Sequence, residues 1–130
     1  MLLSDWVDRF LTEERPVGVM LDSLVVEAQA VAAVNFYAGY AVLTAFRTIL
    51  EPYPAVTLAI DISVSELAII RGLFLLYIER EEAKYWESSR PLGVDVAGRS
   101  VGEVQGDIVN YEMELPRRAF YQDIITVESA

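Results

Sequence analysis

The sequence Ala30–Phe46, "AVAAVNFYAGYAVLTAF", contains seventeen residues without a charge, in a chain of 130 residues with a net charge of −10. A membrane-spanning helix needs about 20 predominantly apolar residues, and this run is shorter and includes Asn35 and Thr44. Tyr37 and Tyr40 would lie near the middle of a bilayer, whereas tyrosine prefers the membrane interface. We therefore expect a helix that is buried by protein, with no membrane partner.

A membrane span is the alternative, because the apolar segment reaches spanning length when it is extended back to Leu24. The extension includes Glu27 and Gln29, and an off-centre charge costs less than the roughly 2.5–3.5 kcal/mol of a central one. The alternative protein is a small single-span membrane accessory or holin-like protein, with its span at about residues 24–46. Extraction that depends on detergent would distinguish it from a protein-buried helix.

The segments before and around this run have helical patterns. Apolar residues recur at helical spacing in "LLSDWVDRFLTEER", and Pro16 then breaks the pattern. Acids at Asp5 and Asp8 stand where a signal peptide would be basic, so we expect no secretion signal. Asp22 or Ser23 can cap the next helix, which we expect to continue to about Ile49 and to end at "EPYP".

Two capping-box motifs mark the starts of two further helices. In "SVSE", Ser63–Glu66, the serine and glutamate side chains can satisfy each other's backbone amides, and a helix to about Ser89 should follow. "SVGE", Ser100–Glu103, opens a helix whose apolar residues share one side, and Pro116 should end or kink it. Between the second and third helices, "AVTLAID" is expected to be a short strand or an extended connector.

These segments predict a mainly α protein. We expect a four-helix bundle domain over residues 1–115, with one short strand, and an extended C-terminal arm over residues 116–130. A chain of this length suits one domain and buries roughly two thirds of the surface that its unfolded form exposes.

Composition excludes many chemistries. The chain has no cysteine and no histidine, which removes disulfides, thiolate ligands and imidazole catalysis. Glu79, Glu81 and Glu82 could suggest a carboxylate metal site, but Lys84 favours a solvated, ion-paired helix face. A carboxylate enzyme would need paired acids with shifted pKa values, and no spacing predicts such a pair. We expect no enzyme activity, no cofactor and no metal.

Two helices are too apolar for a small monomer to surround. Besides the opening run, the segment Leu67–Ile78 is apolar on more than one face, and the hydrophobic fraction of 54% exceeds the usual level of about 45–50%. A four-helix monomer can fully enclose about one such helix, so we expect a homo-oligomer. The aromatic residues expected at the interface between subunits are Phe36, Tyr37, Tyr40, Phe74 and Tyr77.

The C-terminal arm is the segment that we expect to bind a partner. Arginine can pair with carboxylates, aromatic rings can act as rigid anchors, and β-branched residues could add a strand to a partner sheet. The arm could instead fold back onto its own bundle as a last strand. The predicted partner-binding residues are Arg117, Arg118, Phe120, Tyr121, Ile124 and Ile125.

The block "SELAIIRGLFLLYIEREEAKYWESSRPLGVDVAGRSVGEVQGDIVNYEMELPRRAF", within a short acidic chain of four predicted helices, resembles the head-tail joining proteins of tailed bacteriophages. The layout of residues 1–120 is similar to the adaptor, or neck, class. The resemblance rests on the length of the chain, the order of the predicted elements and the general character of the sequence.

The resemblance implies a structural virion protein at the head-tail junction, assembled in the host cytoplasm. It implies a homo-oligomeric ring, of twelve copies in this class, that joins the portal protein to a downstream tail or neck protein and lines the DNA channel. DNA would pass without sequence-specific binding, as the excess of acids over bases suggests. The arm would contact the portal, so its deletion after Pro116 should abolish docking and leave the bundle folded.

Overall fold

The computed structural model describes residues 1–14, 21–89 and 99–122. Within these ranges the chain is mainly α-helical and has no β-strand. Two short turns of other helix types accompany the α-helices. The elements are α1 (Leu3–Arg9), the π-helical turn η1 (Phe10–Glu14), α2 (Ser23–Ala38), the 3₁₀ turn η2 (Thr44–Phe46), α3 (Val64–Ser89) and α4 (Val101–Gln122).

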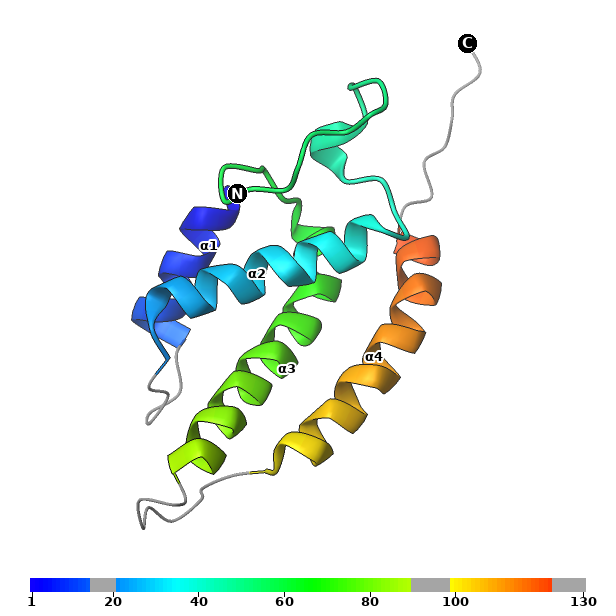
Figure 1. Ribbon diagram of the computed structural model, residues 1–130. Helices are drawn as coiled ribbons and strands as arrows, with labels where there is room; N and C mark the ends of the chain where they lie inside the picture. Colours follow the sequence, from blue (N-terminus) through cyan, green and yellow to red (C-terminus); the bar gives the residue numbers. More distant parts are fainter. Residues whose placement is uncertain (15–20, 90–98, 123–130) are drawn as a thin grey trace.

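Helix α3 is the centre of the arrangement. It packs against α4 along one side and against α2 on another, while α1 lies against α2 (Figure 1). The last turns of α4 lie beside the end of α2, and these two helices also touch. The predicted fold class, a mainly α protein built from four helices that pack together, is confirmed.

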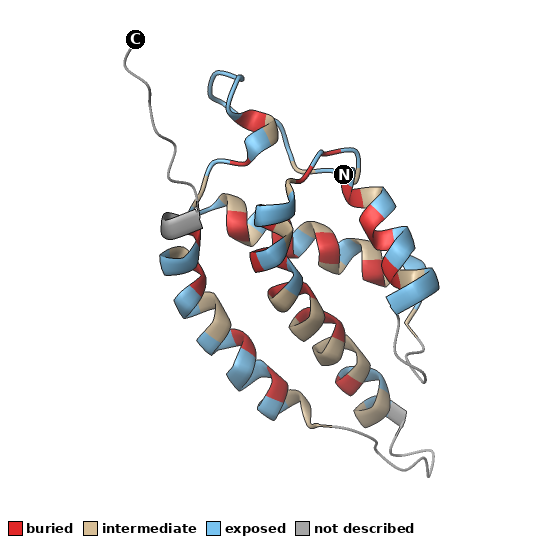
Figure 2. Cartoon of the chain, turned by 180° about the vertical axis from the view of Figure 1, so that it is seen from behind, coloured by how far each residue is buried: buried red, intermediate tan, exposed pale blue. Residues whose placement is uncertain are grey.

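The core gathers aromatic and aliphatic side chains from all four helices. The rings of Trp6 and Phe10 meet the ring of Phe74 edge-on, with centroids 4.8 and 4.9 Å apart. Edge-to-face pairs of this kind add about 0.5–1.5 kcal/mol each beyond the area that they bury. Figure 2 shows the buried positions in red along the inward sides of the helices. From α4 the core receives Val104, Ile108, Leu115 and Ala119.

The first capping box is present at the start of α3. The amide of Glu66 donates to the Ser63 hydroxyl at 3.2 Å, and the amide of Ser63 donates to the Glu66 carboxylate at 3.0 Å. The second motif shows the serine half of the box, in which the amide of Glu103 donates to the Ser100 hydroxyl at 3.2 Å. Both predicted helix starts are therefore confirmed, and α3 ends at Ser89 as expected.

Helix α2 is shorter than predicted, because it ends at Ala38 and not near Ile49. The Gly39 amide closes the helix by donating to the carbonyls of Asn35 and Phe36, each at 3.2 Å. Asp22, one of the two expected caps, accepts from the Leu24 amide at the other end. Glycine is the commonest residue just past a helix end, and leaving the helix here allows the following segment to bend back over the bundle.

The strand expected at residues 55–61 is absent from the described part of the chain. This segment forms a single isolated bridge, in which Asp61 pairs with Leu2 in antiparallel fashion. The Leu3 amide donates to the Ile60 carbonyl at 2.9 Å, but Leu3 already begins α1. Since the partner becomes helical at once, no ladder can extend.

Helix α4 continues through Pro116 to Gln122, so the predicted boundary between bundle and arm falls inside a helix. Leu115 and Ala119, on either side of the proline, are both buried in the core. Burial of these side chains compensates for the backbone hydrogen bond that proline cannot make. The helical part of the chain therefore extends past residue 115.

Candidate interaction surface

Residues 39–63 connect α2 to α3 and rise from one end of the helices (Figure 1). We call this segment the loop. Leu43, Phe46, Ile60 and Ile62 are buried, so the loop is anchored in the core along its first third and at its far end. Between these anchors the chain is largely exposed.

A buried carboxylate fixes the beginning of the loop to the start of α3. The side chain of Glu66 is fully buried, and its two oxygens accept from different segments. One oxygen caps the Ser63 amide, and the other accepts from the Thr44 amide at 3.0 Å. Hydrogen bonds to a charged group contribute about 1.5–3 kcal/mol each, so Glu66 stabilises both the helix start and the loop.

The end of the loop is held by the beginning of the chain. The amides of Leu3 and Ser4 donate to the carbonyls of Ile60 and Leu58, both at 2.9 Å. The Ile62 amide donates in turn to the Met1 carbonyl at 2.8 Å. The loop is thus fixed at both ends by backbone groups and by Glu66.

The exposed part of the loop is rich in large apolar side chains. Leu50 is 90% exposed, Tyr40 is 55% exposed, and the others are each about two fifths exposed. Single exposed apolar residues are common on protein surfaces, and the five on this segment make it the candidate interaction surface. We call this group the loop patch: Tyr40, Val42, Ile49, Leu50 and Tyr53.

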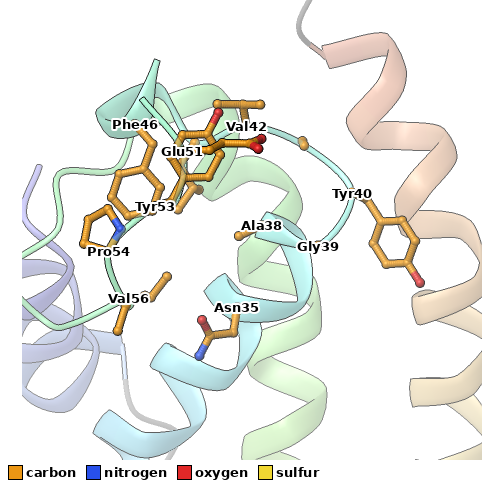
Figure 3. A pocket seen from close by; sticks show the side chains of 13 residues that line it. Asn35, Ala38, Gly39, Tyr40, Val42, Phe46, Glu51, Tyr53, Pro54 and Val56 are labelled. Carbon is orange, nitrogen blue, oxygen red and sulfur yellow. The ribbon is translucent and has the colours of Figure 1, made fainter. Parts of the chain in front are cut away.

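A cleft of about 500 Å³ lies between the end of α2 and the loop (Figure 3). Asn35 and Ala38 come from the helix, and the ring of Tyr53 stacks on Phe46 in the opposite wall, with centroids 5.5 Å apart. The Tyr40 side chain points toward α4. Polar and apolar groups share the surface of the cleft about equally, and the lining residues are Asn35, Ala38, Gly39, Tyr40, Ala41, Val42, Leu43, Phe46, Glu51, Tyr53, Pro54, Ala55 and Val56.

The cleft and the loop patch differ in charge from the rest of the protein. Between residues 35 and 60 the sequence has one base, Arg47, and one acid, Glu51, so this segment has no net charge. The whole chain carries −10. Like charges oppose the association of two surfaces, and this segment is free of that repulsion.

Polar side chains join α3 to α4 away from the loop. The Tyr77 hydroxyl donates to the Glu112 carboxylate at 2.8 Å. Burial of Tyr77, together with this hydrogen bond, raises the pKa of the phenol well above its usual value. The guanidinium of Arg99 binds Glu79 on α3 and Asp107 on α4, and hydrogen bonding to these carboxylates raises the pKa of Arg99. These contacts are structural links between the two helices.

The residues predicted for the interface between subunits divide into two groups. Tyr37, Phe74 and Tyr77 are buried in the core of the single chain, where they contact its own helices. Their rings are therefore occupied by packing within the single chain, and their place at a subunit interface stays a prediction. Phe36 is partly buried and Tyr40 is exposed, and their rings lie 5.4 Å apart.

The predicted partner-binding residues lie on α4 and beyond it. Arg117 is exposed, and Arg118 binds Glu114 at 3.2 Å while its guanidinium lies 5.0 Å from the centre of the Tyr111 ring. Phe120 and Tyr121 belong to the last turn of α4, but their side chains lie outside the described part. Ile124 and Ile125 lie outside the described residues altogether.

The acidic run on α3 forms ion pairs. Glu81 binds Lys84 at 3.3 Å, as the spacing predicted, and Glu82 accepts from the indole N–H of Trp86 at 3.1 Å.

Among the residues that the structure describes, no three acids are grouped closely enough to hold a metal ion. Over the same ranges, no helix combines the length and apolar character that crossing a bilayer requires.

Sequence reasoning missed the tip of the loop, where Ile49 and Leu50 are exposed. The expected helix through Ile49 placed both residues at its end. Gly39 was the available signal, because a glycine after an apolar run is a common helix stop.

Scans against protein-family models, curated proteins and solved structures found no match to this chain.

Proposed function

We propose that this protein is a structural subunit of a tailed-bacteriophage head-tail connector of the adaptor, or neck, class. In this role it forms a homo-oligomeric ring that joins the portal to the next tail component and surrounds the path of the DNA. The sequence resemblance suggests the class. The helical fold is compatible with it, and the loop patch is the observation that carries the proposal.

The loop patch matters because the core is complete without it. Aromatic residues that could have served an interface are buried inside the single chain, whereas Leu50 and Tyr40 are left largely in water. An anchored loop that presents apolar side chains suits an assembly subunit, since its surface is organised before a partner arrives.

The charge balance supports a passage for DNA. With 20 acids against 10 bases, the surface is repulsive to phosphates on average. Repulsion from the wall keeps DNA from adhering while it moves. The neutral segment around the loop supports contacts between proteins, so the two properties of a connector reside on different parts of the chain.

The molar mass of the assembly tests the proposal. The protein is purified without detergent, and light scattering on a sizing column measures its mass alone and with the portal protein encoded in the same genome. We expect a high-order ring, formed alone or on the portal. Protein that stays monomeric in both samples, or that is recovered only with detergent, would contradict the proposal, and the second result would favour the single-span alternative.

A further inference from the structure

We infer that the cleft between the end of α2 and the loop binds an arginine side chain of a partner protein. The inference rests on the proposed function and deepens it, because it names the chemistry through which another connector component contacts this subunit. The cleft would hold the guanidinium, and the loop patch, which shares residues with the cleft, would meet the apolar surface around that arginine.

The cleft combines apolar walls with hydrogen-bond acceptors. Its volume of about 500 Å³ is within the range of small ligand sites. Ala38, Phe46 and Val56 contribute apolar surface, while about half of the lining is polar. Asn35 projects from α2 on the side opposite the rings, and its amide oxygen can accept a hydrogen bond (Figure 3). An arginine side chain has the same division, because its stem is apolar and its planar head carries only donors.

The charged group in the cleft is a carboxylate. Among the described residues that line the cleft, Glu51 is the only one with a charge. It forms no ion pair or hydrogen bond within the part of the chain that the structure describes. Arg47, the nearest base in the sequence, does not line the cleft and has its own partner. The Glu51 carboxylate is therefore available to a cation from another molecule.

The end of α2 adds to the negative potential of the cleft. Ala38 is the last residue of this 16-residue helix, and both Ala38 and Gly39 line the cleft. The carbonyls at the C-terminus of a helix carry a partial negative charge, which favours a cation nearby. The net charge of −10 also attracts a basic partner over longer distances.

The aromatic wall favours a guanidinium over other cations. Phe46 covers one face of the Tyr53 ring, with 13° between the ring planes, and Tyr53 is still 39% exposed. A guanidinium can stack on an open aromatic face and pair with a carboxylate through two parallel hydrogen bonds, whereas an ammonium is a point charge. A metal ion needs several oxygen ligands and gains nothing from apolar walls, and the cleft supplies one carboxylate.

Capped amino acids test the chemistry of the site without a partner protein. N-acetyl-arginine amide represents an arginine within a chain, and N-acetyl-citrulline amide is its neutral isostere. Each is titrated into ¹⁵N-labelled protein, and the amide chemical shifts of Asn35, Gly39 and Tyr53 give the dissociation constant. We expect the arginine compound to bind at least about tenfold more tightly than the citrulline compound. Equal binding would overturn the inference, because the cleft would then not recognise the charge.

Two further compounds identify the source of the cation. We expect N-acetyl-lysine amide and free arginine to bind more weakly than N-acetyl-arginine amide. The lysine ammonium cannot pair through a planar fork, and the α-carboxylate of free arginine is repelled by the acidic protein. Tighter binding of the lysine compound would overturn the choice of a guanidinium. Tighter binding of free arginine would overturn the protein partner in favour of a small metabolite.

Variants of Glu51 and Tyr53 locate the site. Glu51→Gln should weaken binding of the arginine compound at least about fivefold, whereas Glu103→Gln, which removes an exposed acid on α4, should leave it unchanged. Tyr53→Leu should weaken binding at least about threefold, whereas Tyr53→Phe keeps the ring and should not. Far-ultraviolet circular dichroism shows that each variant is folded. Equal effects of Glu51→Gln and Glu103→Gln would overturn the inference, because binding would then follow the overall charge of the protein.

Assembly separates this inference from the proposed function. The molar mass of the unaltered chain, Glu51→Gln and Glu103→Gln is measured alone and with the portal protein. Assembly that Glu51→Gln weakens at least about fivefold, and that Glu103→Gln leaves unchanged, would support both proposals. Assembly that neither variant changes would retain the connector function and reject a partner arginine at the cleft. Specific binding of the arginine compound by a protein that never associates with the portal would retain the site and reject the connector function.

Discussion

The hydroxyl of Tyr111 donates a 2.6 Å hydrogen bond to the backbone carbonyl of Ile69, across the interface between α4 and α3. The Tyr111 ring can approach this closely because Gly72 lies beneath it without a side chain. A Cβ added at Gly72 would lie 2.5 Å from the Tyr111 oxygen and 2.7 Å from the ring carbon that bears it. The approach of the Tyr111 ring to α3 therefore depends on this glycine.

Gly72→Ala should destabilise the protein, although alanine is the better helix former. Alanine gains about 1 kcal/mol of helix propensity, but the overlap with Tyr111 costs about 1–3 kcal/mol. We expect a net loss of about 1 kcal/mol in the free energy of unfolding, measured by urea denaturation. Gly106→Ala on α4 is the matched control, because its new methyl group meets nothing within 4 Å and should stabilise the protein. Stabilisation by both variants would contradict the role of Gly72.

Glu66→Ala should be one of the most damaging single substitutions in the chain. It leaves the amides of Ser63 and Thr44, which make partly buried hydrogen bonds, without their acceptor, and a buried group left unpaired costs about 1–3 kcal/mol. We expect a loss of about 3 kcal/mol and faster hydrogen exchange at the Thr44 amide. Glu103→Ala, at the exposed counterpart in the second capping box, should cost about 1 kcal/mol or less. Equal losses would show that Glu66 does not link the loop to α3.

Stability should fall above pH 10 partly because of Tyr77. Its pKa in the folded protein is raised, so the folded state holds the phenol proton while the unfolded chain, with a pKa near 10, releases it. This contribution is complete below pH 10 and is lost as the pH rises toward the higher pKa. Tyr77→Phe should reduce the slope of unfolding free energy against pH above 10, and it should cost about 1–2 kcal/mol at pH 7 through the bond to Glu112.

The control for this pH dependence is Tyr53→Phe, at an exposed position whose ring stays stacked on Phe46. Urea titrations at several pH values between 8 and 11 give the slopes. Slopes that change equally in the two variants would mean that the Tyr77 site makes no special contribution to alkaline unfolding.

Two truncations test where the helical part of the chain ends. Removal of residues 123–130 keeps the whole of α4 and gives the reference midpoint. Termination after Leu115 removes the buried Ala119 and the contact of Arg118 with the Tyr111 ring, and it should cost at least about 1–2 kcal/mol. Deletion after Pro116, which the sequence suggested would spare the bundle, is therefore expected to destabilise it. Differential scanning calorimetry measures the midpoints.

Local motifs predicted much of the fold. Ser63 and Glu66 correctly predicted the start of α3, because a capping box depends only on residues three positions apart. Val104 and Ile108 marked the buried side of α4 because a helix repeats every 3.6 residues. The predicted C-terminal end of α2 was wrong, because the uncharged run continues past Ala38 and the helix was expected to continue with it. The helix instead ends before Gly39.

Features that join distant segments could not be predicted in the same way. The bond from Tyr77 to Glu112 spans 35 positions, and the bond from Thr44 to Glu66 spans 22. Each of these hydrogen bonds depends on how the helices and the loop pack against one another in the folded chain. The candidate surface was missed for the same reason. The sequence around Leu50 does not indicate whether the folded chain buries or exposes this side chain.

The anchoring of the loop by Glu66 at its beginning and by the segment around Leu3 at its end has a consequence for evolution. Substitutions near Leu50 alter no buried contact, while substitutions at the anchors disturb the core. The fold therefore constrains the anchors directly, whereas the residues near Leu50 are constrained only by the surface that they meet.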